Sequence, residues 1–347
     1  MSGLSEIGTA VIGSGFIGTV HIEDGGGRGI RTRHRRDVTS GSGDRASSHH
    51  LGIDLGATNL KWAVVERTGA DWRTVDRGQV PTAAAEGPGA VIGRLTEIGR
   101  GRQRAWPGMG TVGIGVPGLY DPAAGTTRFL VNVPGAWADR PVAAPVAQAL
   151  GLPCQLINDA RAFGVAELRL GAGREASSMV GLTLGTGVGG VIAIDGRVLQ
   201  GHDGTAGEIG HQTIDPDGPL CGCGNRGCLE AFAKADRIAA ACGAPTAGEA
   251  VQAARRGDQR ALGGLDEIGR YLGIGIANVI TLISPDRVVI GGGLAAAGEL
   301  LLSPIREELG RRVLTTSLDR VALVTAELGK WAGAIGAAVH GAEANAG

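Results

Sequence analysis

The sequence predicts an α/β protein made of two domains of similar plan. Apolar runs at 51–55 and 60–66 flank a polar turn that contains Gly56, which is the pattern of a β-hairpin. Residues 178–199 repeat this pattern as strand, Gly/Thr turn and strand. Strands also alternate with helices along the rest of the chain. Two α/β halves that face each other are therefore the arrangement we expect.

The other elements can be justified in chain order from apolar runs and helix-stop signals. Between the hairpins we expect a buried strand at 111–121, a helix at 141–151 closed by Gly151, a strand at 154–159 and a helix at 160–171. After the second hairpin we expect a helical region at 230–280, a strand and turn at 285–295, a strand at 321–328 and an Ala-rich helix at 331–343.

The composition excludes several classes of protein. Lys and Arg number 33 against 34 acidic residues, so no overall charge favours nucleic acid or membrane partners. No apolar run approaches the roughly 20 residues that span a bilayer, and the N-terminus lacks a secretion signal. We expect a cytoplasmic protein with reduced thiols.

Residues 1–48 hold a misleading motif. Gly13, Gly15 and Gly18 follow an apolar run as in a dinucleotide-binding turn, which would indicate an NAD-dependent oxidoreductase. That site also needs a helix and a second strand ending in an acid, whereas an Arg-rich, Gly/Ser-rich stretch follows. We interpret residues 1–48 as a disordered leader that results from a non-native or misplaced start.

Three glycine-containing turns are candidate phosphate sites, because such turns expose successive backbone N–H groups. They lie at 54–61, 184–190 and 288–295, and none of them matches the Walker motif. Their candidate nucleotide-binding residues are Asp54, Gly56, Thr58, Lys61, Thr186, Gly187, Gly292 and Gly293.

The segment 207–232 contains a complete set of ligands for zinc. One imidazole and three thiols come from His211, Cys221, Cys223 and Cys228, which suits a tetrahedral site. A disulfide would leave one of these cysteines unpaired and is disfavoured in a reducing compartment. Four protein ligands leave no open position on the ion, so we predict a structural zinc loop rather than a catalytic metal. Cys154 and Cys242 are expected to be buried elsewhere.

The order of these motifs resembles the sugar kinase/actin-like ATPase fold, with its duplicated ribonuclease H-like domains. The zinc segment resembles specifically the ROK family, which includes bacterial glucokinases, other hexose kinases and sugar-responsive repressors; the likeness covers about 50–343. This resemblance implies a small domain at 49–160 plus 328–347 and a large domain at 161–327 that carries the zinc loop. It also implies ATP-dependent phosphorylation of a hexose, chiefly glucose, at the 6-hydroxyl.

The resemblance further implies roles for individual residues. Asp159 would be the general base, and Asp54 would hold the Mg²⁺ of ATP through water. Sugar contacts would come from Asn132, Asn158, Asp159, Glu208, His211 and Glu230, with His211 also a zinc ligand. Plainer alternatives are a helix cap for Asp159, solvated acids for Glu208 and Glu230, and a turn residue for Asn132.

The chain departs from the family's pattern after Asp159, and the sequence leaves several substrates and functions open. Family members commonly have Asn-Asp-Ala-Asn where this chain has Asn-Asp-Ala-Arg161-Ala-Phe163, which alters the sugar pocket. The sugar could instead be N-acetylmannosamine, fructose or allose, and polyphosphate could replace ATP. A repressor would need an N-terminal winged helix-turn-helix of about 60 to 80 residues, and only about 50 residues without helical period precede the fold. The resemblance to the ROK family favours a homodimer or homotetramer. We expect no nucleic acid or membrane partner.

Overall fold

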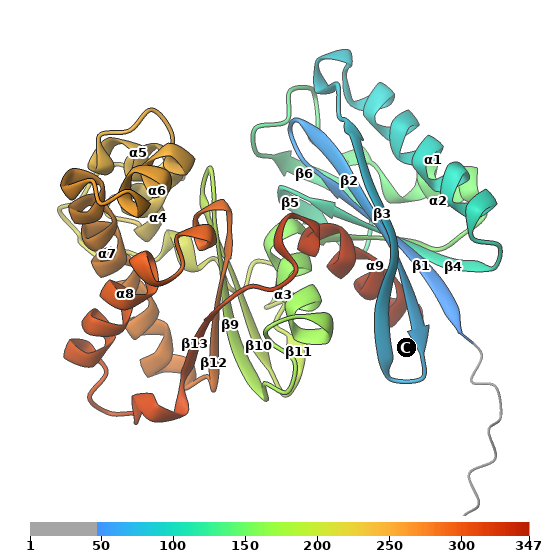
Figure 1. Ribbon diagram of the computed structural model, residues 1–347. Coiled ribbons are helices and arrows are strands. Elements are labelled where there is room, and N and C mark those ends of the chain that lie inside the picture. The colour runs from blue at the N-terminus through green and yellow to red at the C-terminus, as the bar shows by residue number, and fades with distance from the viewer. Residues whose placement is uncertain (1–46, 347) are drawn as a thin grey trace, which may run out of the picture. The chain divides into compact units, whose positions relative to one another are not determined.

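The computed structural model describes residues 47–346 (Figure 1). The first glycine motif and almost all of the leader predicted at 1–48 lie outside these residues. Within the described part, no helix is long and apolar enough to cross a membrane.

Two five-stranded sheets form the frame of the protein. The first has the order β3-β2-β1-β4-β8, and the second has the order β11-β10-β9-β12-β13. The strands of the first are β1 (Ser48–Leu55), β2 (Asn59–Thr68), β3 (Asp71–Pro81), β4 (Met109–Val116) and β8 (Cys154–Asn158). Those of the second are β9 (Ser178–Leu184), β10 (Val188–Ile194), β11 (Arg197–Val198), β12 (Arg287–Gly292) and β13 (Ala322–Thr325).

The two sheets share one plan. In each sheet, the first three strands in sequence are antiparallel neighbours. A fourth strand pairs in parallel with the first of them, and a fifth pairs in parallel with the fourth. This repetition confirms the two similar α/β halves that the repeated hairpin predicts. A separate three-stranded sheet contains β5 (Gly118–Asp121), β6 (Thr126–Leu130) and β7 (Arg140–Pro141).

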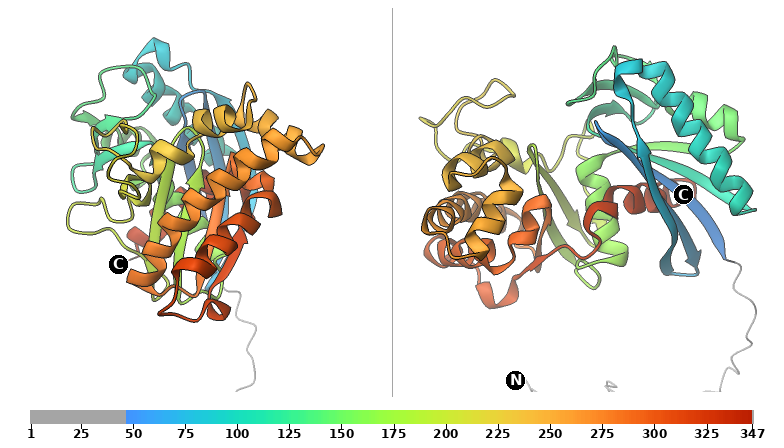
Figure 2. Two further views of the ribbon diagram at one scale, coloured as in Figure 1. Left: turned by 90° about the vertical axis from the view of Figure 1, so that its left-hand side faces the viewer. Right: turned by 45° about the horizontal axis from the view of Figure 1, so that its top comes forward.

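Helices cover both faces of each sheet, and two of them lie between the sheets (Figures 1 and 2). On the first sheet, α1 (Pro88–Ala105) and α2 (Ala143–Leu150) pack on one face and α9 (Ala332–Ala344) on the other. On the second sheet, α7 (Gln259–Ile283) and α8 (Glu299–Arg312) share a core with one face, and α3 (Asp159–Leu170) packs on the other. The shorter helices are α4 (Leu229–Ala233), α5 (Ala235–Cys242), α6 (Ala247–Arg255), η1 (Ala84–Glu86), η2 (Ile209–His211), η3 (Gly293–Ala297), η4 (Leu318–Arg320) and η5 (Gly329–Trp331).

Helix α7 shows how the sequence encodes the core of the second half. Asp258 caps its start, because the Asp258 carboxylate accepts a hydrogen bond of 2.9 Å from the Ala261 N–H. Apolar residues then recur every three or four positions, which places them on one buried face. They include Leu265, Ile268, Leu272, Ile276 and Ile280.

Close backbone contacts join α3, α9 and the first sheet. A side chain at Gly113 of β4 would overlap the carbonyl oxygen of Ala337, and one at Gly336 would overlap that of Ala162. Small residues are therefore required here, which explains the Ala-rich composition of α9. Helices α3 and α9 share one apolar cluster with strands of both sheets.

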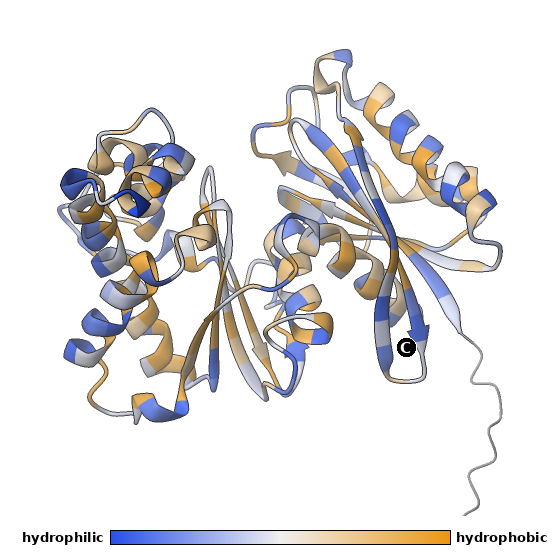
Figure 3. Cartoon of the chain, in the orientation of Figure 1, coloured by the Kyte–Doolittle hydropathy of each residue, from blue (hydrophilic) through white to orange (hydrophobic). Residues whose placement is uncertain are grey.

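The structure corrects some predicted boundaries. The strand expected at 111–121 is broken into β4 and β5 at Pro117, which has no N–H to donate, and Gly118 follows with φ +123°. The strand expected at 321–328 is shorter. Strand β3 and helices α1 and α8 were not predicted. Figure 3 shows apolar and hydrophilic residues interleaved along β2 and β3. The division into domains at 160/161 and 327/328 stays a prediction.

Candidate active site and metal centre

The junction of β8 and α3 presents Asn158 and Asp159. The Asn158 side chain caps α3, since its Oδ1 accepts from the N–H groups of Ala160 (3.0 Å) and Arg161 (3.2 Å). Its Nδ2 donates to the Gly118 carbonyl at 3.2 Å. The capping role considered for Asp159 therefore belongs to Asn158, and the Asp159 carboxylate is left for another purpose.

Asp159 lies in an environment that favours its protonated form. Burial raises the pKa of Asp159 to about 7, and the negative charges of Asp54 and Glu208 act in the same direction. A hydrogen bond of 2.8 Å from the Ala160 N–H to Oδ1 opposes these effects. Carboxyl groups from β1 and from the segment before η2 thus act electrostatically on Asp159. A carboxylate with a pKa near 7 suits proton transfer at neutral pH.

The first hairpin brings Asp54 and Lys61 together. Lys61 Nζ donates to Asp54 Oδ2 at 3.1 Å, and both side chains are partly buried. The turn itself is held by a hydrogen bond of 2.6 Å from the Thr82 hydroxyl to the Gly56 carbonyl. Thr58 is exposed at its tip. An acid, a lysine and the exposed residue Thr58 thus lie at one place.

The other two turns lie side by side in the second half. Gly292 of β12 pairs with Leu184 of β9, so the β9–β10 turn and the turn after β12 meet at the same sheet edge. Thr186, Gly292 and Gly293 are exposed there, and Gly187 is partly buried.

A cavity of about 140 Å³ opens beside these two turns. Its walls are mostly apolar, which suits a flat ring. The lining consists of Leu184, Gly185, Ala235, Ile238, Ala247, Gly248, Gly293 and Leu294. Gly293 is among the predicted nucleotide-binding residues, whereas Leu294 and the residues from α5 and α6 were not predicted. The small residues at the starts of α5 and α6 are the only sequence signal for them.

The predicted sugar-contacting residues do not all have the same surroundings. Glu208 is exposed, whereas Glu230 accepts a hydrogen bond of 2.9 Å from the Val188 N–H and contacts the turn that holds Gly187. Glu230 is therefore held against the turn between β9 and β10, and it is only partly exposed. Asn132 is exposed with φ +59°, a left-handed conformation that asparagine tolerates in turns. A contact between Asn132 and a sugar stays a prediction.

The four candidate metal ligands converge. The ligand atoms of His211, Cys221, Cys223 and Cys228 all lie within 4.8 Å of one another. Cys221 Sγ is 3.7 Å from His211 Nδ1, and Cys223 Sγ is 3.7 Å from Cys228 Sγ. Zinc–sulfur bonds of about 2.3 Å in a tetrahedron place two sulfurs about 3.8 Å apart. The cluster therefore fits a zinc ion and is too open for a disulfide.

The loop around this cluster has little freedom. A side chain at Gly227, where φ is +67°, would overlap the Asp215 carbonyl. Two isolated bridges, Thr213–Cys228 and Leu220–Arg226, hold the loop together. Burial raises the pKa of the Cys221 thiol to about 12, and a bound cation would favour its thiolate form.

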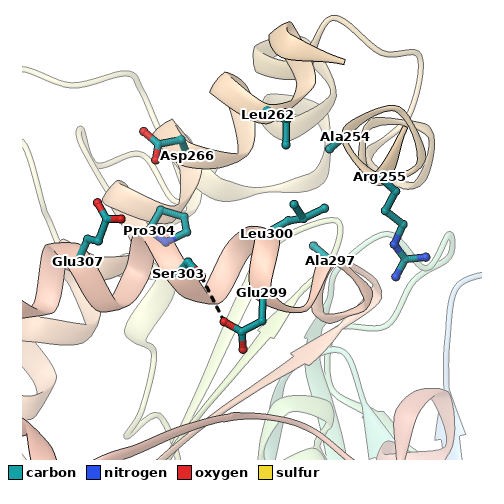
Figure 4. A pocket seen from close by; sticks show the side chains of 10 residues that line it. All are labelled: Ala254, Arg255, Leu262, Asp266, Ala297, Glu299, Leu300, Ser303, Pro304 and Glu307. Atoms are coloured by element: carbon teal, nitrogen blue, oxygen red, sulfur yellow. Dashed lines mark hydrogen bonds between the residues drawn. The ribbon is translucent and has the colours of Figure 1, made fainter. Parts of the chain in front are cut away.

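A larger groove of about 670 Å³ lies between α6, α7 and α8 (Figure 4). It contains none of the predicted site residues. Its lining is Ala254, Arg255, Leu262, Asp266, Ala297, Glu299, Leu300, Ser303, Pro304 and Glu307. The groove is thus separate from the carboxyl groups described above.

Duplicated sheets, a strand-end aspartate and paired glycine turns are the features that the resemblance to sugar kinases implies. The family model described as "ROK family" matches residues 50–342, and the chain belongs to this family. A glucokinase from Thermotoga maritima is 35% identical over 311 residues, which cover 83% of this chain and 95% of the relative. The chain is accordingly a sugar kinase.

Solved structures agree with this assignment. A ROK hexokinase from Thermus thermophilus has a TM-score of 0.73 and 34% identity, covering 87% of this chain and 100% of that one. A ROK family glucokinase from Streptomyces griseus, in complex with glucose and AMPPNP, has a TM-score of 0.72 and 31% identity, covering 85% and 100%. The expected sugar kinase fold is confirmed.

Other activities also occur among the relatives. An N-acetylmannosamine kinase from Citrobacter koseri is 33% identical and covers 83% of this chain and 97% of the relative. A putative xylose repressor from a Caldicellulosiruptor species is 32% identical, but the match spans only 58% of the repressor.

Proposed function

We propose that the protein transfers the γ-phosphoryl group of ATP to the 6-hydroxyl of glucose. The observation that carries this proposal is Asp159, a carboxyl group of raised pKa at the start of α3, with Asp54 and Glu208 beside it. The likeness to the S. griseus glucokinase supports glucose and an adenine nucleotide as ligands.

Asp159 would act as the general base. Its Oδ1 is bound to the Ala160 N–H, which leaves Oδ2 to accept the proton of the 6-hydroxyl. The sugar oxygen would then attack the γ-phosphorus in line with the leaving oxygen. Because phosphoryl transfer needs little covalent help, positioning and charge neutralisation would supply most of the rate.

The glycine turns would hold the nucleotide. Backbone N–H groups at Gly187 and Gly293 would donate to phosphate oxygens, together with the hydroxyl groups of Thr58 and Thr186, and Gly56 would line the nucleotide. Asp54 would hold Mg²⁺ through water, and Lys61 would neutralise phosphate charge. Gly292 would allow the ligand to approach the backbone closely. The 140 Å³ cavity would take the adenine ring.

The sugar would bind between Asn158, Glu208, His211 and Glu230, with Asn132 from the first half. His211 Nδ1 faces the Cys221 sulfur, so Nε2 would be free to contact a hydroxyl group. His211, Cys221, Cys223 and Cys228 would hold a structural zinc ion. When bound, zinc would neutralise the thiolates and cross-link the loop that carries these residues.

The first test is ADP release from ATP with glucose, mannose, fructose, allose and N-acetylmannosamine as acceptors. Glucose should give the highest kcat/KM, and the product should be the 6-phosphate. Preference for N-acetylmannosamine would assign the activity of the C. koseri relative instead. Polyphosphate tested in place of ATP decides the donor. Tight sugar binding with no turnover would indicate a sensor.

The second test is Asp159→Asn. Loss of a general base lowers kcat by about 10²- to 10⁴-fold, and sugar affinity and metal content should be retained. Asp266→Asn, a change at an exposed aspartate in the separate groove, is the matched control and should leave kcat unchanged. Equal activity of the two variants would disprove the role of Asp159. Light scattering on the same samples tests the expected homodimer or homotetramer.

A further inference from the structure

Arg161 is a buried arginine beside the proposed sugar site. It lies in the first turn of α3, two residues after Asp159, and its side chain is only 2% exposed. Its Nη2 donates to the Ala206 carbonyl at 2.9 Å. The same atom lies 3.6 Å from Glu208 Oε1. Arg161 therefore reaches from α3 to the segment that precedes the metal loop.

The hydrogen bonding of this guanidinium is incomplete. Within residues 47–346, Arg161 Nε is buried and has no hydrogen-bond partner. A buried cation is costly unless it is paired and hydrogen-bonded. The contact with Glu208 is too long for a charge-assisted hydrogen bond, which is about 2.7–2.9 Å. Arg161 and Glu208 thus form an ion pair without a direct hydrogen bond.

A hydroxyl group can complete this pair. A hydroxyl accepts one hydrogen bond and donates another, so it can bridge a guanidinium and a carboxylate. Glu208 is available for this purpose, because its side chain is 42% exposed. A carbonyl group could only accept from Arg161 and would leave Glu208 unpaired. The arrangement therefore selects for a hydroxyl group on the ligand.

We propose that Arg161 is a specificity-determining residue that, with Glu208, binds one hydroxyl of the sugar, at C1 or C2, away from the 6-hydroxyl assigned to Asp159. This inference rests on the proposed function, since it takes a hexose as the ligand near Glu208. The hydroxyl accepts from the Arg161 guanidinium and donates to the Glu208 carboxylate. Sugars that lack this hydroxyl leave both charges unsatisfied.

A purely structural role for Arg161 makes a different prediction. If Arg161 only anchored the segment at Ala206, its loss would weaken the binding of every sugar by the same factor. If it reads a hydroxyl, its loss lowers activity on glucose more than on the analogue that lacks that hydroxyl. The comparison between sugars therefore separates the two roles.

The experiment compares Arg161→Met and Arg161→Lys with the wild type on glucose, 2-deoxyglucose and 1,5-anhydroglucitol. Methionine keeps most of the buried volume and removes the charge. Arg161→Met should lower kcat/KM for glucose by about 10- to 100-fold, mainly through KM, and leave the KM for ATP unchanged. On one of the two deoxy sugars the loss should be less than about threefold. Arg161→Lys keeps a charged donor, so its kcat/KM for glucose should lie between those of the wild type and Arg161→Met.

Arg169→Met is the matched control. Arg169 also lies on α3, where its Nε donates to Glu343 at 2.7 Å, away from the proposed sugar site. This variant should keep the wild-type preference among the three sugars. Equal losses on all three sugars, or an unchanged KM for glucose, in Arg161→Met would overturn the inference.

Two further results keep the test decisive. If Arg161→Met fails to fold, Glu208→Gln and Arg161→Lys are compared with the wild type instead. In both variants, the ratio of kcat/KM for glucose to kcat/KM for the same deoxy sugar must fall. If this ratio falls for one deoxy sugar in one variant and for the other deoxy sugar in the second variant, Arg161 and Glu208 do not bind the same hydroxyl. A wild-type protein that phosphorylates no hexose would refute the proposed function itself, before any variant is compared.

Discussion

At the scale of single residues, Asp159 should control the pH dependence of the reaction. Burial raises its pKa to about 7, with Asp54 and Glu208 contributing. Only the ionised form can accept a proton, so log(kcat/KM) should rise with pH at a slope near 1 and level off above about pH 7. Glu208→Gln removes one negative charge and should move this rise to lower pH. The check is a profile from pH 5 to 9, and a profile that is flat over this range would contradict it.

The sequence could identify Asp159 but not the partner of Arg161. An acid at the end of a buried strand is visible in the sequence of 154–159, and the four candidate metal ligands are visible from their types and spacing. The approach of Arg161 to Glu208 joins positions 47 residues apart (208 minus 161), and no local pattern indicates it. The capping role of Asn158 was missed because it depends on where α3 begins.

At the scale of elements, the loop 211–228, which carries the four candidate metal ligands, should determine the affinity for the sugar. Cys223 is exposed, so Cys223→Ser removes one ligand with little effect on the core. We expect one zinc per wild-type chain by mass spectrometry, and loss of zinc together with at least a tenfold higher KM for the sugar in the variant. Cys154→Ala, a change at a buried cysteine of β8, should keep its zinc. A wild-type protein without zinc would contradict this expectation.

Elements with clear apolar runs were predictable, and those with mixed patterns were not. Strand β3 interleaves exposed charged residues with partly buried ones, and its place at the sheet edge gives it no buried run. Helix α1 contains Gly93, Gly99 and Gly101, which weaken its helical signal. Helix α8 carries Pro304 inside its length. Tertiary packing on the sheets decides these three elements.

At the scale of the whole molecule, Glu167 ties the two halves together. Its fully buried carboxylate accepts hydrogen bonds from the N–H groups of Ala172 (2.8 Å), Glu327 (3.1 Å) and Leu328 (3.0 Å). Residues 327 and 328 belong to the link between β13 and α9. The end of α3 is thereby fastened to the segment that runs from the second sheet to the first.

Replacing this carboxylate should lower stability. Glu167→Gln puts an NH₂ group where an acceptor is needed and leaves at least one backbone N–H unpaired, which costs about 1–3 kcal/mol in the free energy of unfolding. Urea unfolding measures this loss. Glu327→Gln, a change at an exposed side chain of the same link, should cost less than about 0.5 kcal/mol. Equal stability of the two variants would show that the buried contacts contribute nothing.

The close packing of α9 also determines when the protein can complete its folding during synthesis. The backbone of α9 lies directly on Gly113 of β4 and, through Gly336, on α3, so residues 332–344 complete a core that earlier segments begin. A nascent chain still attached to the ribosome, with these residues inside the exit tunnel, leaves one face of the first sheet bare. Asp159, the proposed general base at the start of α3, therefore reaches its final surroundings only after translation has passed this helix.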